Sequence, residues 1–369
     1  MIFKIKIIIG LCVAILLGLA LYVTNVQIIS PDTFLYKSTI ESLNQENQEE
    51  IDTSVVKFDC DTKDVKKFSC YEDYYKTLLK DFGVASAFID LKKRIISDDY
   101  IKEKCHPLVH VLGNVAVEKY PTVTEAYKYG DGFCASGYYH GVLEGVIRKI
   151  DKGDLAKQMN NICEDIDGNK SDYFSCVHGL GHGAMAYSNN ELFDALVLCD
   201  ELDDDWKKIS CYSGVFMENV IVDQKDHFTK YLKPDDLLYP CNAVDRKYMK
   251  ACYEMQSSYI LKIKGDFGKV FEECEKADDG FRNSCYESIG RDASAHSIEY
   301  SEDITSATKD ICYLGKSFWE RNMCVFGAIK YFIYHYESPD QAIQLCNSLE
   351  MYLQSVCSSI AKVYYRQNF

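Results

Sequence analysis

The chain lacks the sequence features of several common functional classes. Its 56 acidic residues outnumber its 41 basic residues, which gives a formal charge of −15, and no basic stripe is present. Nucleic-acid binding needs clustered Lys and Arg to displace counterions from phosphates, so this class is excluded. The sequence contains no phosphate-binding glycine loop, no nucleophile elbow and no dinucleotide-binding fingerprint. Alternating strand patterns are sparse, which argues against a β-rich fold.

The sequence also lacks the close CxxC pairs that are typical of zinc-binding arrays, although it has 17 cysteines. Sixteen of these form eight pairs. In seven pairs the two cysteines are separated by nine to twelve residues, and the eighth pair consists of the two cysteines left over. Such regular pairing indicates a chain of disulfide-stapled units in an oxidising compartment. The predicted pairs are Cys60/Cys70, Cys105/Cys134, Cys163/Cys176, Cys199/Cys211, Cys241/Cys252, Cys274/Cys285, Cys312/Cys324 and Cys346/Cys357.

The N-terminus predicts export. Lys4 and Lys6 precede an apolar run that extends from Ile7 to Val23 and resumes at Ile28. A run of this length is short for a membrane-spanning helix and long for a signal-peptide core, so residues 1–29 are either an uncleaved anchor or a signal peptide. We expect the anchor, with the membrane as its partner and the rest of the chain on the extracytoplasmic side. A polar tether at 30–57 would then lead to a domain at 58–369.

That domain reads as a series of two-helix units. Residues 191–199 carry apolar side chains at helical spacing and end at Cys199, a polar turn follows at 203–205, and a second apolar helix contains Cys211. An antiparallel hairpin of this kind brings its two cysteines within the ~5.5 Å that a disulfide needs. The second cysteine of the units recurs every 29 to 42 residues, the range of helical repeats. We therefore expect an all-α solenoid of two-helix repeats, each hairpin closed by a disulfide.

On these repeat lengths and paired cysteines, residues 58–369 resemble Sel1-like and tetratricopeptide repeat proteins, in particular the bacterial cysteine-rich secreted ones. The resemblance implies the architecture and no functional residues. Glycine stands three residues after the second cysteine in four units, at Gly137, Gly179, Gly214 and Gly327. Because glycine weakens a helix interior, its recurrence predicts close packing between helices.

Five of the eight histidines lie between residues 106 and 182, the centre of a His-rich portion at about 100–220. His110, His140 and His182 follow the second cysteine of successive units by five or six residues, so in stacked helices they would lie at one level. His106 and His178 precede His110 and His182 by four residues and share their helix faces. The five histidines are a plausible ligand set for a transition metal ion such as Zn, Fe or Cu.

Two carboxylates could complete such a site. Glu144 follows His140 by four residues and could act as a ligand or as a general base on metal-bound water. Glu218, in the next unit, could be a further ligand or could support one. Pro107 suggests that its helix begins there, which leaves the direction of His106 open. The sequence thus predicts a metal-dependent enzyme or metal-handling protein, or alternatively a scaffold that binds a protein or peptide on its concave face with structural histidines.

Overall fold

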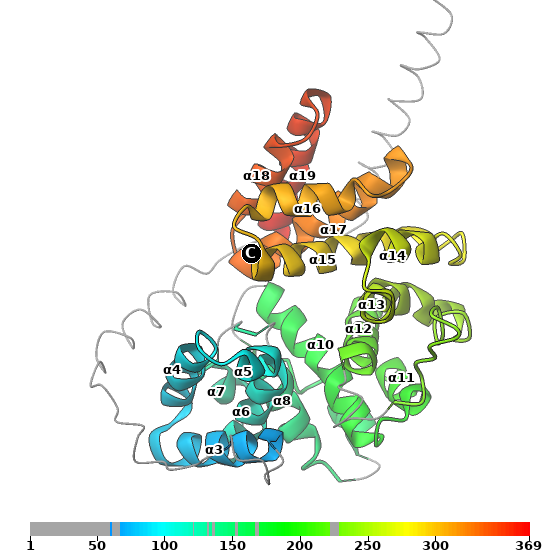
Figure 1. Ribbon diagram of the computed structural model, residues 1–369. Helices are drawn as coiled ribbons and strands as arrows, with labels where there is room; N and C mark the ends of the chain where they lie inside the picture. The colour runs from blue at the N-terminus through cyan, green and yellow to red at the C-terminus, as the bar shows by residue number, and fades with distance from the viewer. Residues whose placement is uncertain are drawn as a thin grey trace, which may run out of the picture.

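The computed structural model describes residues 60, 67–120, 122–130, 133–134, 137–151, 154–166, 170–221 and 229–369. Every named element in these ranges is a helix, from α3 to α19, which confirms the all-α prediction (Figure 1). The predicted anchor at 1–29 and the tether at 30–57 lie outside the described residues. Within the described ranges, no helix has both the length and the apolar character that a bilayer crossing requires.

Short and long helices alternate along most of the chain, as the two-helix repeat requires. The short ones in the second half have eight or nine residues, and the long ones that follow them have 17 to 19. The helices up to the centre of the chain are α3 (Lys67–Phe82), α4 (Val84–Arg94), α5 (Asp99–Glu103), α6 (Cys105–Lys119), α7 (Val123–Tyr127), α8 (Gly137–Ile147), α9 (Leu155–Gln158) and α10 (Lys170–Tyr187). The remainder are α11 (Leu192–Asp200), α12 (Asp205–Ile221), α13 (Arg246–Lys264), α14 (Phe267–Cys274), α15 (Arg282–Tyr300), α16 (Ile304–Cys312), α17 (Phe318–Tyr336), α18 (Asp340–Asn347) and α19 (Met351–Asn368).

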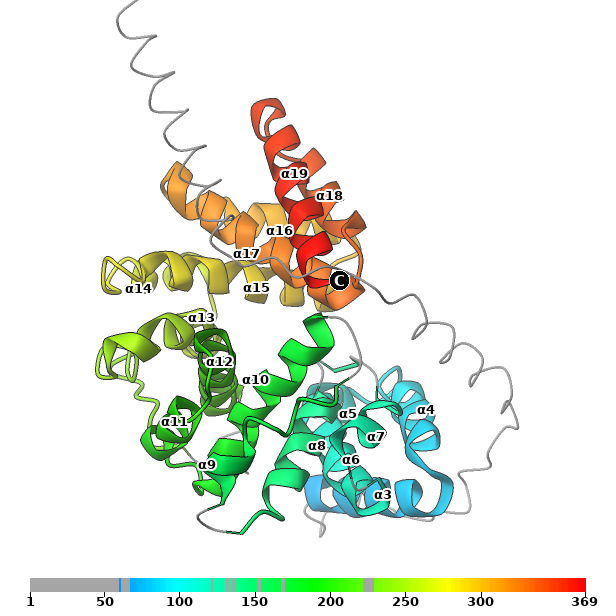
Figure 2. The ribbon, with the colours of Figure 1, turned by 180° about the vertical axis from the view of Figure 1, so that it is seen from behind.

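The long helices stack in chain order. Helix α6 packs against α8, α8 against α10, α10 against α12, and the series continues through α13, α15 and α17 to α19. The stack is not straight, because α19 comes back to contact α10, and the hydroxyls of Ser175 in α10 and Tyr334 in α17 lie 2.9 Å apart. Figure 2 shows this return, with α17 and α19 above the upper end of α10. Small rotations between successive repeats produce such curvature.

All eight predicted cysteine pairs are disulfides, with Cα–Cα distances from 5.4 to 5.9 Å. One of them differs from the hairpin plan. Cys105 is the first residue of α6, and Cys134 lies three residues before the first residue of α8, so this bond ties the starts of two neighbouring long helices. The whole of α6 and α7 lies between the two cysteines, which is why their separation is the longest of the eight.

A second departure concerns the unit of Cys241. The repeat plan places a short helix before this cysteine, but residues 229–245 form successive turns. Pro234 and Pro240 account for the difference, because a proline within a helix lacks the N–H that the helix needs and clashes with the preceding turn. The amide of Gln256 in α13 donates hydrogen bonds to the carbonyls of Leu237 and Tyr239 and so holds these turns against the stack.

The close packing predicted at glycines is confirmed at Gly214 and Gly327, where long helices cross, whereas Gly179 meets only the side chain of Leu143. A Cβ atom added to Gly141 in α8 would lie 2.1 Å from the carbonyl oxygen of His110 in α6. One added to Gly214 in α12 would lie 1.9 Å from the carbonyl oxygen of His178 in α10. A similar crossing joins α15 and α17, where Gly327 faces the carbonyl of Glu287. The backbones therefore touch at these points, and only glycine permits it.

Candidate metal centre

The five histidines of the sequence prediction lie together on three successive long helices. Helix α6 contributes His106 and His110, α8 contributes His140, and α10 contributes His178 and His182. His140 lies at the centre, with ring centroids 5.6, 5.4, 5.3 and 4.0 Å from those of the other four in chain order. The rings of His140 and His182 are stacked. We call these five residues the histidine cluster.

The glycine crossing of α6 and α8 explains why the rings of His106 and His110 come so close to that of His140. Helix α8 lies directly on the backbone of His110, and α12 lies directly on the backbone of His178. Helices that carry larger residues at their contact stay about 8–10 Å apart. Where two backbones touch, the helices lie closer together than this. Side chains about one turn from the crossing on the two helices then occupy the same small volume.

The cluster is buried on one side and reaches the surface on the other. His140, His178 and His182 are only 2%, 6% and 2% exposed, respectively. His106 and His110 are half-buried. Buried imidazoles thus form the floor of the cluster, and its rim is accessible to water.

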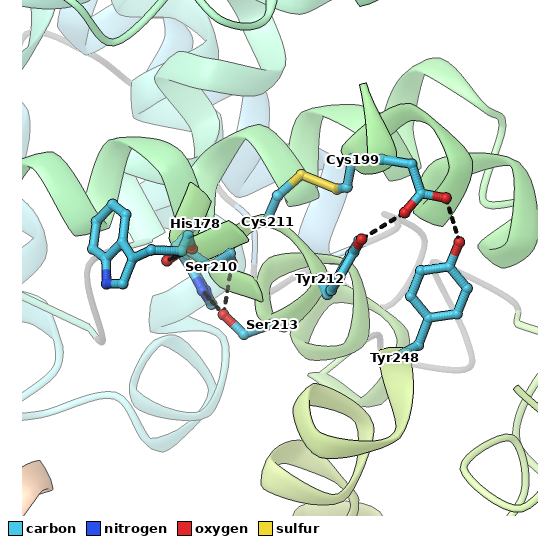
Figure 3. Close-up of a disulfide and its surroundings, with 9 residues drawn as sticks. His178, Cys199, Ser210, Cys211, Tyr212, Ser213 and Tyr248 are labelled. Carbon is cyan, nitrogen blue, oxygen red and sulfur yellow. Dashed lines mark hydrogen bonds between the residues drawn. A yellow bond between two sulfur atoms is a disulfide. The ribbon is translucent and has the colours of Figure 1, made fainter. Parts of the chain in front are cut away.

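The Nδ1 atoms of two histidines donate hydrogen bonds away from the centre. His106 Nδ1 lies 2.8 Å from the carbonyl oxygen of Cys134, which can only accept. His178 Nδ1 lies 2.8 Å from the hydroxyl oxygen of Ser213 (Figure 3). That hydroxyl donates its proton to the carbonyl of Ser210 at 2.7 Å, so it accepts from His178. Both imidazoles therefore carry their proton on Nδ1 and a lone pair on Nε2.

Figure 3 also shows how the fold holds Ser213 in place. The disulfide between Cys199 and Cys211 fastens α11 to α12 two residues before the serine. Tyr212 and Tyr248 both donate hydrogen bonds to Asp200 at the end of α11, at 2.5 and 2.6 Å. The part of α12 next to Ser213 is thus fixed by a covalent bond and by a shared carboxylate.

Carboxylates lie behind two other histidines. Glu218 Oε2 in α12 is 2.6 Å from His182 Nδ1, and Glu144 Oε2 in α8 is 3.8 Å from His110 Nδ1. Glu144 also accepts hydrogen bonds from Asn114 and Arg148. The carboxylate of Glu218 is within hydrogen-bond distance, so it fixes the ring orientation and the tautomer of His182 and leaves Nε2 free to bind a metal ion.

The consequence is that lone pairs face each other inside the cluster. His178 Nε2 lies 3.2 Å from His182 Nε2, and both rings hold their proton on the opposite nitrogen. The other neighbour of His178 Nε2 is the sulfur of Met217 at 3.1 Å, which has no proton to donate. His106 and His110 also bring their Nε2 atoms together, at 3.1 Å. Opposed acceptors are unfavourable unless a cation lies between them.

His140 adds a buried polar atom that has no partner. Its Nδ1 makes no hydrogen bond, although the residue is 2% exposed. A buried polar atom without a partner costs roughly 1–3 kcal/mol. Coordination of a cation by the central imidazole would remove that cost.

The cluster strongly resists protonation. Burial lowers the pKa of His106 to about 3, with a further contribution from His110. Burial, and then the neighbouring histidines, hold the pKa values of His140 and His178 well below the usual range. Burial also lowers the pKa of His182, although Glu218 opposes the shift. These four imidazoles are therefore neutral at physiological pH, which is the form that binds metal ions.

Glu144 has the opposite tendency and favours its charged form. Burial opposes ionisation of Glu144, but its contacts with His110 and the charge of Arg148 outweigh that effect and lower its pKa.

Three sets of side chains place their ligand atoms within 4.8 Å of one another and could hold an ion. They are His106 with His110 and His140, His140 with His178 and His182, and His110 with His182 and Glu218.

The structure also resolves points that the sequence left open. Helix α6 begins at Cys105 and not at Pro107, because a proline in the first turn has no N–H partner to lose. His106 therefore lies inside the helix and faces the cluster. The Cys134 carbonyl, Ser213 and Met217 are contacts that the sequence prediction missed. Met217 had a signal, because it follows Cys211 by six residues, the offset of His140 and His182 from their own cysteines.

Comparison with known proteins found no family model, no curated protein and no solved structure that matches the chain.

Proposed function

We propose that the histidine cluster is a binding site for transition metal ions. The observation that carries this proposal is the opposition of two unprotonated nitrogens, His178 Nε2 and His182 Nε2, in a buried environment that disfavours a proton. A bound cation converts this repulsion into two coordinate bonds. Eight disulfides and the absence of a free cysteine among the described residues are consistent with an oxidising, extracytoplasmic location.

The spacing of the nitrogens supports this function. Two imidazole nitrogens at about 2.0–2.1 Å from a tetrahedral ion lie roughly 3.3–3.4 Å apart. The two Nε2–Nε2 distances in the cluster are 3.1 and 3.2 Å. Each i,i+4 histidine pair is thus within a few tenths of an ångström of the separation that one ion requires.

The hydrogen bonds around the cluster support it as well. Histidine ligands generally donate their second N–H to a carboxylate, a carbonyl or a hydroxyl, which fixes the ring and raises its basicity. His106, His178 and His182 have such partners in the Cys134 carbonyl, Ser213 and Glu218. Ordinary core histidines need one hydrogen bond, and packing does not require two i,i+4 pairs that each bring their Nε2 atoms together.

The proposal extends to the two glutamates. Glu144 and Glu218 orient His110 and His182, and Glu218 is close enough to be a ligand itself. The lowered pKa of Glu144 makes this carboxylate a weaker base than an ordinary glutamate. We therefore favour an orienting role for Glu144 over general-base catalysis, and the metal-dependent enzyme stays a hypothesis. Binding of a protein or peptide partner on the concave face also stays a prediction.

The test is the metal content of the oxidised full-length protein after exposure to Zn(II), Fe(II) and copper, measured by mass spectrometry. The His140→Ala variant removes the central ring, and His296→Ala, outside the cluster in α15, is the matched control. We expect bound metal in the native protein and in the control and its loss in His140→Ala. Equal metal content in all three, or none in a folded native protein, would contradict the proposal.

A further inference from the structure

The histidine cluster contains one donor that is not a nitrogen or an oxygen. The sulfur of Met217 in α12 lies 3.1 Å from His178 Nε2, the atom that faces His182 Nε2. A methionine that merely packs on an aromatic ring keeps its sulfur about 5 Å from the ring. Here the sulfur lies beside the ring nitrogen, close enough for both atoms to bind one metal ion.

A second methionine makes a different contact, in which its sulfur accepts a hydrogen bond. In α13, the sulfur of Met255 lies 2.9 Å from a guanidinium nitrogen of Arg291, which donates a hydrogen bond to it. Met217 has no such donor in His178, because the proton of that ring is on Nδ1 and is given to Ser213. The two thioethers occupy the same kind of inter-helix position, and one faces a proton donor while the other faces a lone pair.

Resting on the metal-binding function proposed above, we propose that His178, His182 and Met217 form a subsite selective for monovalent copper, Cu(I). Thioether sulfur is a soft ligand that favours Cu(I), whereas Zn(II) sites take thiolate, imidazole and carboxylate. Two imidazoles and one thioether complete a three-coordinate site. Ligands at about 2.0 Å (nitrogen) and 2.3 Å (sulfur) from one ion and 3.1 Å apart subtend roughly a right angle there.

The other end of the cluster has a different donor set. His106, His110 and His140 place three imidazoles together, and the carboxylate of Glu144 lies 3.8 Å from His110 Nδ1. Nitrogen and oxygen donors suit Zn(II) and other divalent ions. The two ends have the same backbone arrangement. The carbonyl of His110 is in contact with Gly141 of the next helix, and the carbonyl of His178 is in contact with Gly214. The ends differ in the side chain that faces the histidine, which is Glu144 in one case and Met217 in the other.

The experiment compares Cu(I) and Zn(II) affinities of the metal-free, disulfide-bonded full-length chain. Cu(I) is supplied anaerobically as its acetonitrile complex and titrated against bicinchoninate, and Zn(II) against a zinc chelator. Met217→Leu should weaken Cu(I) binding by about tenfold or more and leave Zn(II) affinity within about twofold. The sulfur contribution in the copper X-ray absorption spectrum should disappear in this variant. Met255→Leu, the matched control, should change neither affinity.

Each other outcome overturns the inference. Equal loss of Cu(I) and Zn(II) affinity in Met217→Leu would show that Met217 only supports the fold, and unfolding measurements on both leucine variants check this independently. Unchanged Cu(I) affinity would remove the thioether from the site. A native protein that binds Zn(II) and no Cu(I) would refute the copper subsite and leave the proposed function intact. A native protein that binds neither ion would refute both.

Discussion

The glycine crossing at Gly181 allows a quantitative prediction. A Cβ atom added there would lie 2.1 Å from the carbonyl oxygen of Cys211 and 2.6 Å from the backbone nitrogen of Val215. Real Cβ atoms essentially never approach other atoms more closely than 3.0 Å. In Gly181→Ala, α10 and α12 must therefore separate by about 0.9 Å or more, and the disulfide that fastens Cys211 to Cys199 resists the movement.

The expected change in stability has two opposing parts. Alanine is favoured over glycine in a helix by roughly 0.5–1 kcal/mol, whereas overpacking against a rigid backbone costs about 1–3 kcal/mol. We expect Gly181→Ala to be destabilised by about 1–2 kcal/mol. Gly179→Ala is the matched control on the same helix, since its new Cβ would meet only the side chain of Leu143, at 3.1 Å. That variant should be neutral or slightly more stable.

Urea unfolding of both variants measures this difference, and a metal titration measures its effect on the site. Because Gly181 lies between His178 and His182, separation of the helices moves Met217 and Glu218 away from both rings, so Gly181→Ala should also bind metal more weakly. Equal stability of the two variants, or a more stable Gly181→Ala, would refute this crossing as the contact that holds Met217 and Glu218 against the histidine cluster.

Three further predictions follow from the same contacts. Glu218→Gln should weaken metal binding about 10–100-fold, because His182 loses its carboxylate, and the exposed Glu201→Gln should not; a titration of both compares them. The metal-free protein should lose stability as the pH falls from 6.5 toward 3, because His106 binds a proton in the unfolded chain and not in the folded state. Urea unfolding of His106→Asn should show a flatter dependence of stability on pH. An unchanged slope in this variant would contradict the prediction. Replacing Cys346 and Cys357 by serine should lower the free energy of unfolding by about 2–3 kcal/mol, because the loop between them is no longer closed in the unfolded chain. The metal content should not change, and loss of the metal would instead show that the array folds as one unit.

Much of this architecture could be predicted from the cysteines. In a helical hairpin, one cysteine near the end of the first helix and one near the start of the second fix the pairing, so spacing alone identified seven bonds. The same cysteines set the level of the side chains that follow them. This is why His140 and His182, six residues after Cys134 and Cys176, could be expected to meet.

Other features could not be predicted from spacing. The hydrogen-bond partners of the histidines depend on how closely α8 and α12 approach their neighbours, and that distance is set at Gly141 and Gly214 by backbone contact. The turns before Cys241 depend on prolines that interrupt the repeat. The return of α19 to α10 results from small rotations summed over many repeats, for which no single residue carries a signal.

The most direct test of the account is a crystal structure of the metal-loaded protein, with diffraction data collected on both sides of the metal absorption edge. We predict an anomalous peak within the histidine cluster, at coordination distance of about 2.0–2.3 Å from His178 Nε2 and His182 Nε2. The side chains around it should keep the hydrogen bonds to Ser213 and Glu218 described above. An anomalous map with no peak between these rings, in crystals that contain metal elsewhere, would contradict the central claim.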